Sequence, residues 1–146
     1  MHIKIVMTLP PEAASVPLVR RTVAEAMRSA GVAGDCVEEA SVALSEACTN
    51  VYHHAEAEDH YEVVITLESE RLTMDILDSG NGFNGQLHQP TMPQGTAENG
   101  RGVALMAAFS DQVVFDSVLH DGGSVHLMKR LRWANGAPTV AADAAS

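Results

Sequence analysis

The sequence predicts an α+β fold, a two-layer sandwich in which helices cover one face of a mixed, mostly antiparallel sheet. Strand-like segments with alternating apolar residues and segments with helical spacing occur in partly separate runs. Two pairs of strand-like segments are joined by short turns, as in antiparallel hairpins. An apolar content of 46% over 146 residues is enough to bury one core.

The N-terminal part reads as a strand followed by a helix. Residues 2–9 alternate and are rich in isoleucine and valine, which predicts an edge strand that ends at the two prolines after it. A helix is expected to start between Ser15 and Pro17, because proline suits the first turn, and to end near Gly31, because glycine commonly follows the last helical residue. Its expected apolar side comprises Leu18, Val19, Val23, Ala26 and Met27.

The second predicted helix carries two polar residues that need an explanation. It runs from Asp35, expected as the N-cap residue with Glu38 completing a capping box, to about Ala55. The helix is apolar over much of its circumference, so it should be substantially buried. Glu46 and Asn50 lie four residues apart and therefore share one of its faces.

Two hairpins, a long loop and a short helix make up the remainder. The predicted strands span residues 60–68, 71–77, 112–119 and 124–131. Residues 83–99 form a polar loop with glycines and prolines, of a length that is uncommon in compact domains unless the loop is functional. A short helix is expected from Val103 to Phe109. We expect a single domain over residues 1–133 and a disordered tail over 134–146.

Charge and cysteine content exclude several classes of function. The net charge is −10, whereas a nucleic-acid binder normally has a basic patch. The basic cluster Lys129, Arg130 and Arg132 is short and is predicted to be a solvated strand end. No apolar run reaches the ~18 residues of a membrane span, and the N-terminus lacks the pattern of a signal peptide. We therefore expect a cytoplasmic protein that contacts neither nucleic acid nor membrane, with Cys36 and Cys48 as buried, reduced thiols.

A glycine-rich segment, Asp78-Ser79-Gly80-Asn81-Gly82-Phe83, directly follows a predicted strand. Its two glycines let the backbone turn tightly and approach a ligand. With Gly85 it spells G-x-G-x-x-G, but the prolines that follow make a poor first helical turn, which disfavours a dinucleotide-binding loop. A Walker loop is also absent, because no G-K-[ST] occurs. In isolation the segment could equally be an ordinary turn.

Other unusual features accompany this segment and weaken the ordinary-turn interpretation. Glu46 and Asn50 are polar residues on a mostly buried helix, and Gly100 and Gly102 form a second glycine pair after the long loop. The sequence holds no lysine or arginine between residues 28 and 71, so Glu46 has no cationic neighbour on its own helix.

Together these segments resemble the motifs of the GHKL (Bergerat-fold) ATPase superfamily. Residues 46–50, with 53–55 after them, resemble its N box, and residues 78–83 resemble its adenine-binding G1 box. Residues 100–106 resemble the G2 box at the base of an ATP lid, and residues 123–125 resemble the strand start that closes the pocket. The short format is most similar to the anti-sigma factor serine/threonine-protein kinases of bacterial partner-switching systems.

The resemblance implies that the chain binds ATP and Mg²⁺. Glu46 would be the general base, Asn50 would hold the magnesium ion, and Asp78 would accept a hydrogen bond from the adenine amino group. Backbone N–H groups near Gly100 and Gly102 would meet the phosphates. The implied ATP-binding residues are Asn50, His54, Asp78, Gly80, Gly82, Phe83, Gly100, Arg101, Gly102, Val103 and Ser124.

Two of these residues have competing interpretations. Arg101 would contact the terminal phosphate or would be a solvated lid residue. His54 would support the pocket or the lid. Together with His53, Glu56 and His60 it also suggests zinc, but the spacing fits no common zinc site, so zinc is disfavoured.

The implied function is that of an anti-sigma factor. It would sequester a sigma factor and phosphorylate an anti-anti-sigma partner of the STAS type on serine or threonine, as a homodimer. Two alternatives stay open: a non-catalytic ATP-gated protein-binding regulator of the same fold, and a detached histidine-kinase-type ATPase module. Glu46 argues against the first alternative, because a pure binder would not need it.

Overall fold

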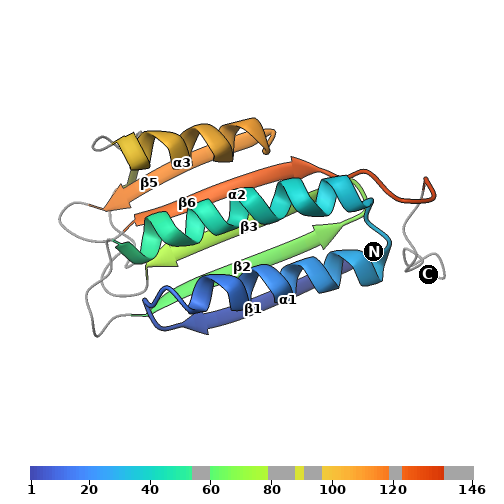
Figure 1. Cartoon of the computed structure of the whole chain (residues 1–146), viewed down its shortest axis with the longest axis horizontal. Coiled ribbons are helices and arrows are strands. Elements are labelled where there is room, and N and C mark those ends of the chain that lie inside the picture. Colours follow the sequence, from blue (N-terminus) through green and yellow to red (C-terminus); the bar gives the residue numbers. More distant parts are fainter. Residues whose placement is uncertain (54–59, 79–87, 91–96, 119–122, 137–146) are drawn as a thin grey trace.

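The computed structural model describes residues 1–53, 60–78, 88–90, 97–118 and 123–136, which form a helical layer over one sheet (Figure 1). The helices are α1 (Ser15–Ala30), α2 (Gly34–His53) and α3 (Ala97–Ala108). The strands are β1 (His2–Leu9), β2 (Tyr61–Glu68), β3 (Arg71–Asp78), β4 (His88–Pro90), β5 (Gln112–Val118) and β6 (Gly123–Arg130). Among these residues, no helix is long and apolar enough to cross a membrane.

The sheet has the strand order β1-β2-β3-β6-β5-β4, and each described pairing is antiparallel. The two predicted hairpins, β2–β3 and β5–β6, meet where β3 pairs with β6 at the centre. All three helices lie on the same face of the sheet, with α2 between α1 and α3 (Figure 1). The predicted two-layer α+β fold is therefore confirmed.

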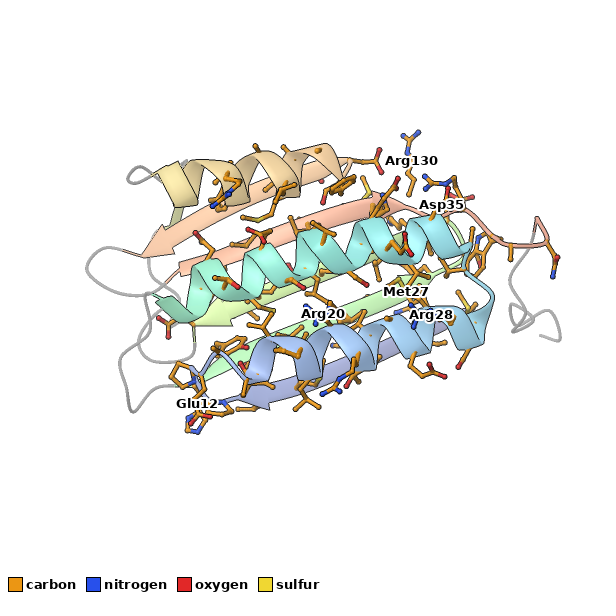
Figure 2. The ribbon with its side chains drawn as sticks, viewed as in Figure 1. Glu12, Arg20, Met27, Arg28, Asp35 and Arg130 are labelled. Carbon is orange, nitrogen blue, oxygen red and sulfur yellow. The ribbon has the colours of Figure 1, made fainter. Side chains whose placement is uncertain are left out.

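The core lies between the two layers, where side chains from both fill the space (Figure 2). Alternate residues of β2 and β3 are buried, because one face of the sheet packs against the helices and the other does not. On α1, Met27 is buried while Arg20 and Arg28 are exposed, which is the amphipathic pattern of a surface helix (Figure 2). Gly31 ends α1 in the left-handed conformation, as predicted, with φ of 99°.

Three element boundaries differ from the sequence prediction. Helix α3 begins at Ala97 rather than Val103, because a glycine inside a helix costs only about 1 kcal/mol and does not end it. Asp35 lies within the first turn of α2 rather than at its N-cap, since the Val37 N–H already donates to the Ala33 carbonyl at 3.0 Å. Strand β4 lies inside the predicted loop. It was not predicted, because three residues are too few to show the alternation of a strand.

The observed exposure of three side chains differs from the prediction. Leu18, expected on the apolar side of its helix, is 51% exposed, and Val42, on the helix expected to be substantially buried, is 36% exposed. Lys129 is only 5% exposed, so the prediction of a solvated strand end is wrong for this residue. Lys129 pairs with Leu72 in the sheet and therefore faces the helices. Cys36 and Cys48 are buried free thiols, as predicted.

Candidate functional site

The candidate site lies at the end of the molecule where α2 and β3 finish and α3 begins (Figure 1). Helix α2 contributes Glu46 and Asn50, both partly buried, one helical turn apart. Strand β3 contributes Asp78 as its last residue. Helix α3 contributes Gly102, which is buried. The fold thus gathers three of the predicted motifs on the helical side of the sheet.

Glu46 and Gly102 are in direct contact between α2 and α3. A β-carbon at residue 102 would stand 2.9 Å from Oε1 of Glu46, closer than real β-carbons approach a neighbouring atom. A side chain at residue 102 would therefore require the Glu46 carboxylate, which is the end of a flexible side chain, or one of the helices to move. The sequence predicted both residues from separate motifs, and the packing of α3 on α2 brings them together.

The Glu46 carboxylate has no positive partner in the part of the chain that the structure describes. The ion pairs found there involve other acidic residues, namely Asp35, Glu39, Glu68 and Asp75. This agrees with the lack of a cationic neighbour in the helix sequence. A partly buried carboxylate without a cation is free to accept a proton or to face a bound cation.

Asn50 lies one turn beyond Glu46 on α2 and is partly buried. Its side chain makes no hydrogen bond to any residue among the described segments, so neither a capping nor a core-amide role is seen for it. The amide oxygen suits a hard cation, since Mg²⁺ prefers oxygen ligands and keeps several waters. Asn50 and Glu46 together offer oxygen atoms on one face of the helix.

Asp78 is 2% exposed and belongs to the buried face of β3, in alternation with Leu72, Met74 and Ile76. Its neighbour in the sheet is Tyr61, whose hydroxyl is hydrogen-bonded to the Ser15 hydroxyl at the start of α1. A carboxylate is rarely buried to this degree without a structural or binding role.

Ser124 and Asp78 lie at the same end of neighbouring strands but on opposite faces of the sheet. Ser124 pairs with Leu77, and successive strand residues point to opposite faces. The Ser124 residue is nevertheless buried, at 9% exposure. On α3, Arg101 is exposed and Val103 is partly buried. Glu46, Asn50, Asp78 and Gly102 therefore lie on the helical side of the sheet. Ser124 lies on the opposite face.

Several predicted site residues lie outside the described residues: His54, Gly80, Gly82 and Phe83. Gly100 is described only as part of the α3 backbone. The tail expected to be disordered also falls outside from residue 137 onward. In the remaining, described part of the chain, no group of three or more histidine, cysteine or acidic side chains could hold a metal ion.

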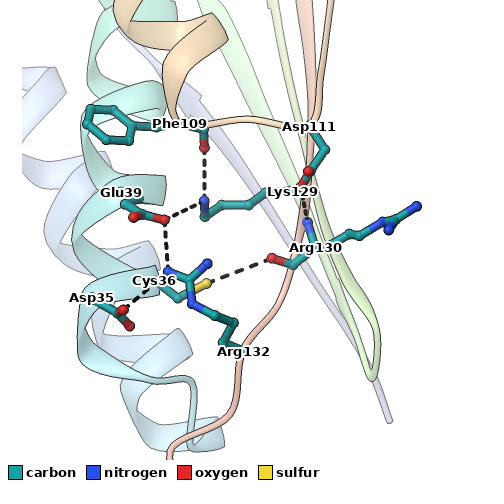
Figure 3. A network of polar contacts seen from close by, with 8 residues as sticks. All are labelled: Asp35, Cys36, Glu39, Phe109, Asp111, Lys129, Arg130 and Arg132. Atoms are coloured by element: carbon teal, nitrogen blue, oxygen red, sulfur yellow. Dashed lines mark hydrogen bonds and ion pairs between the residues drawn. The ribbon is translucent and has the colours of Figure 1, made fainter.

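A buried polar contact that the sequence did not predict lies at the opposite end of α3. Lys129 Nζ donates hydrogen bonds to Glu39 Oε1 at 2.8 Å and to the Phe109 carbonyl at 3.0 Å (Figure 3). The available signal was the alternation of Val125, Leu127 and Lys129, which shows that the lysine continues the core-facing side of the strand.

Comparison with known proteins identifies the family. The model of the histidine kinase-like ATPase domain matches residues 9–129. A serine-protein kinase RsbW of Bacillus mycoides (strain KBAB4) is 34% identical over 137 residues, covering 87% of this chain and 84% of the relative. A serine-protein kinase RsbW of Bacillus cereus (strain AH187) is 33% identical with the same coverage. The chain therefore belongs to the histidine kinase-like ATPase family, in the GHKL superfamily that its motifs predicted, alongside the serine-protein kinases RsbW.

Proposed function

We propose that the chain is an ATP-dependent protein serine/threonine kinase and anti-sigma factor. It sequesters a sigma factor and phosphorylates an anti-anti-sigma partner of the STAS type on serine or threonine. The observation that carries the proposal is the Glu46 carboxylate, which lies against Gly102 without a cationic partner among the described residues. Similarity to two serine-protein kinases over most of the chain supports it.

The residues of the site suit ATP and Mg²⁺. Asp78, a buried acceptor at the end of a rigid strand, would receive the adenine amino group and select the base. Asn50 would hold Mg²⁺, which supplies neutralisation of the phosphate charge. Arg101, exposed on α3, would contribute a charge-assisted hydrogen bond to the terminal phosphate. The glycines at residues 80 and 82, and Phe83, would complete the adenine side of the pocket.

Glu46 takes the proton of the attacking hydroxyl in this proposal. Phosphoryl transfer needs mainly positioning and charge neutralisation, so one carboxylate beside a magnesium ion is a sufficient set of groups. The Glu46 carboxylate is suited to this because it is partly shielded from water and not already neutralised by a lysine or arginine in the described chain.

The proposal is tested by incubating the protein with Mg-ATP and a STAS-type partner and measuring phosphoserine or phosphothreonine. We expect Glu46→Gln to lower the rate about 10²- to 10⁴-fold. Glu38→Gln is the matched control, because Glu38 lies on the same helix and is exposed. Full activity in Glu46→Gln would contradict the assignment of the base. If the wild type gives no product, the proposed kinase activity is contradicted. The alternative function as a non-catalytic ATP-gated protein-binding regulator then remains.

We further propose that residues 1–133 act as one cytoplasmic kinase domain that forms a homodimer. Among the described strands β1 lies at an edge of the sheet, where the main-chain groups on its outer side can pair with a second strand. Sedimentation equilibrium with and without Mg-ATP measures the oligomeric state, and a monomer at all concentrations would contradict the dimer.

A further inference from the structure

The C-terminal end of α3 is held by a buried lysine from the sheet. Lys129, on β6, donates one hydrogen bond to Glu39 on α2 and another to the carbonyl of Phe109, the residue after α3 (Figure 3). Its side chain is almost entirely buried. One ammonium group therefore ties three elements together, since it belongs to β6 and bonds to both helices.

The connection after α3 is fixed by the same strand in two further places. The Asp111 N–H donates to the Met128 carbonyl at 2.8 Å, and the Arg130 N–H donates to Asp111 Oδ2 at 2.7 Å. The end of α3 is thus attached to β6, while Lys129 is the group that also links it to α2. Arg132 binds the same Glu39 oxygen, at 2.9 Å, but among the described residues it makes no hydrogen bond or ion pair with α3.

The two helices touch in matching places along their length. Glu39 and Glu46 are two turns apart on α2 and share one face, about 10 Å apart along the helix axis. Gly102 in α3 and Phe109, the residue after α3, are the same number of residues apart as Glu39 and Glu46. Glu46 meets Gly102 directly, and Glu39 meets the Phe109 carbonyl through Lys129. The helices run in opposite directions (Figure 1). These two contacts, one within α3 and one at the residue that follows it, therefore both constrain how far α3 is shifted along α2.

We infer that Lys129 is a positioning residue for Glu46: by joining Glu39 to the Phe109 carbonyl it sets the position of α3 along α2, and so holds Gly102 against the Glu46 carboxylate. The inference about the helices rests on contacts alone, and its consequence for phosphotransfer rests on the proposed function. Without Lys129 the Phe109 carbonyl and the Glu39 carboxylate lose their shared donor. The end of α3 then stays attached to β6 through Asp111 but is no longer tied to α2, so α3 can tilt relative to Glu46.

A double-mutant cycle in the nucleotide-free protein tests the positioning. Gly102→Ala places a methyl group against the Glu46 carboxylate, which must turn aside or displace α3, and the resulting strain should raise the unfolding equilibrium constant. In Lys129→Met the helix can shift, so the same substitution should raise that constant by a clearly smaller factor. Arg132→Met is the matched control: it removes the other cation from Glu39 but leaves the Phe109 contact, so the effect of Gly102→Ala should be unchanged.

A merely structural role for Lys129 gives a different result. Distant substitutions without shared partners usually act independently, so the effect of Gly102→Ala would then agree within about twofold in all three backgrounds. That agreement would overturn the inference. Should Lys129→Met fail to fold, Glu39→Gln replaces it in the cycle, since it weakens the anchor of the same ammonium group; here also, an unchanged effect of Gly102→Ala overturns the inference.

Phosphotransfer kinetics then test the consequence for the reaction. With folded proteins, Lys129→Met should lower kcat at least tenfold with little change in KM for Mg-ATP, and Arg132→Met should change neither. Equal kcat in these two variants would overturn the role in the reaction. A wild type without any phosphotransfer would instead contradict the proposed kinase, while the cycle would still decide whether Lys129 positions α3.

Discussion

The carboxylate of Glu46 lies against the backbone of Gly102, so that a β-carbon at residue 102 would stand 2.9 Å from Oε1. Gly102 is inside α3, where glycine is about 1 kcal/mol less favourable than alanine in the absence of other constraints. The close approach of the carboxylate explains why a glycine is found there. Two motifs that are more than fifty residues apart thus depend on each other through one contact.

Replacing Gly102 with alanine should therefore act opposite to helix propensity. The methyl group forces either the Glu46 side chain or α3 to move, and because the carboxylate is the end of a flexible side chain we expect a small net stability loss, of up to about 1 kcal/mol. We also expect at least a tenfold loss of phosphotransfer, because Glu46 leaves its position. Urea unfolding and the phosphotransfer assay measure the two effects.

Gly34→Ala is the control for this substitution. Gly34 is also helical, as the first residue of α2, but no atom lies within 4 Å of its added β-carbon. Its replacement should be neutral or slightly stabilising. In addition, Glu46→Ala should relieve most of the stability loss caused by Gly102→Ala. Equal effects of the two glycine substitutions would show that the contact with Glu46 is not the cause.

Asp78→Asn should abolish most of the stabilisation by Mg-ATP. In the wild type, ATP at a hundred times its Kd should raise the free energy of unfolding by about 2.7 kcal/mol. Loss of one buried hydrogen bond costs roughly 1–3 kcal/mol, which weakens ATP binding by about one to two orders of magnitude. Thermal shifts with ATP, ADP and GTP, with and without Mg²⁺, measure the change.

Asp75→Asn is the matched control on the same strand. Asp75 lies on the opposite face of β3, where its Oδ1 is 2.5 Å from Nδ1 of His126. Its substitution should leave the ATP-induced shift unchanged. An Asp78→Asn variant with a wild-type ATP shift would contradict the assignment of Asp78 as the adenine acceptor.

Cys48 should make the protein less stable at alkaline pH. Burial raises the pKa of its thiol from 9.0 to about 12. Between these values the unfolded chain loses the proton while the native chain keeps it, so the free energy of unfolding falls as pH rises, by up to about 1.4 kcal/mol per pH unit. Below pH 9 the thiol contributes no pH dependence.

Urea unfolding between pH 8 and 10.5 tests this slope against Cys48→Ala. The variant loses some packing at all pH values, but its stability should decline less steeply above pH 9 than that of the wild type. Parallel curves for the two proteins would contradict the raised pKa of Cys48.

Glu39 should contribute to the loss of stability in acid. Hydrogen bonds from Lys129 and then Arg132 lower the pKa of this carboxyl below its ordinary value of 4.5. A group with a lowered native pKa stabilises the fold above its unfolded pKa, and this contribution is lost as pH falls through the native pKa. The side chain is partly exposed, so solvent screening makes the contribution modest.

Unfolding by urea from pH 7 to pH 3 compares the wild type with Glu39→Gln. The variant should be less stable at pH 7 and should lose less further stability on acidification. Glu38→Gln, which removes an exposed carboxylate from the same turn, should follow the wild-type curve. A wild-type acid slope in Glu39→Gln would contradict the lowered pKa.

Local sequence patterns predicted most of the fold, because strand alternation and helix ends depend mainly on neighbouring residues. Alternation of apolar residues marked the strands of both hairpins, and Gly31 marked the end of α1, where its left-handed conformation is observed. Helix α3 was predicted too short, because Gly102 resembles a helix boundary in sequence. The close approach of the Glu46 carboxylate, which favours a glycine at this place, is not contained in any local pattern.

Local patterns also fail to predict which charged side chains are buried. Lys129 and Arg132 look alike in sequence as members of one basic cluster, but only Lys129 is on the core-facing side of β6. Its burial required a carboxylate from α2 and a carbonyl from the end of α3, which are remote in the chain. Sequence reasoning could detect the alternation but not these partners.

By itself the sequence determined the α+β architecture, the candidate residues Glu46, Asn50 and Asp78, and the family that its motifs resemble. These follow from periodicity and from short motifs, which are properties of neighbouring residues. The tertiary structure decided which of these residues meet. The contact of Glu46 with Gly102, and the link from Glu39 through Lys129 to α3, arise because two helices pack side by side on one sheet, and such packing is set by the whole core rather than by any one segment.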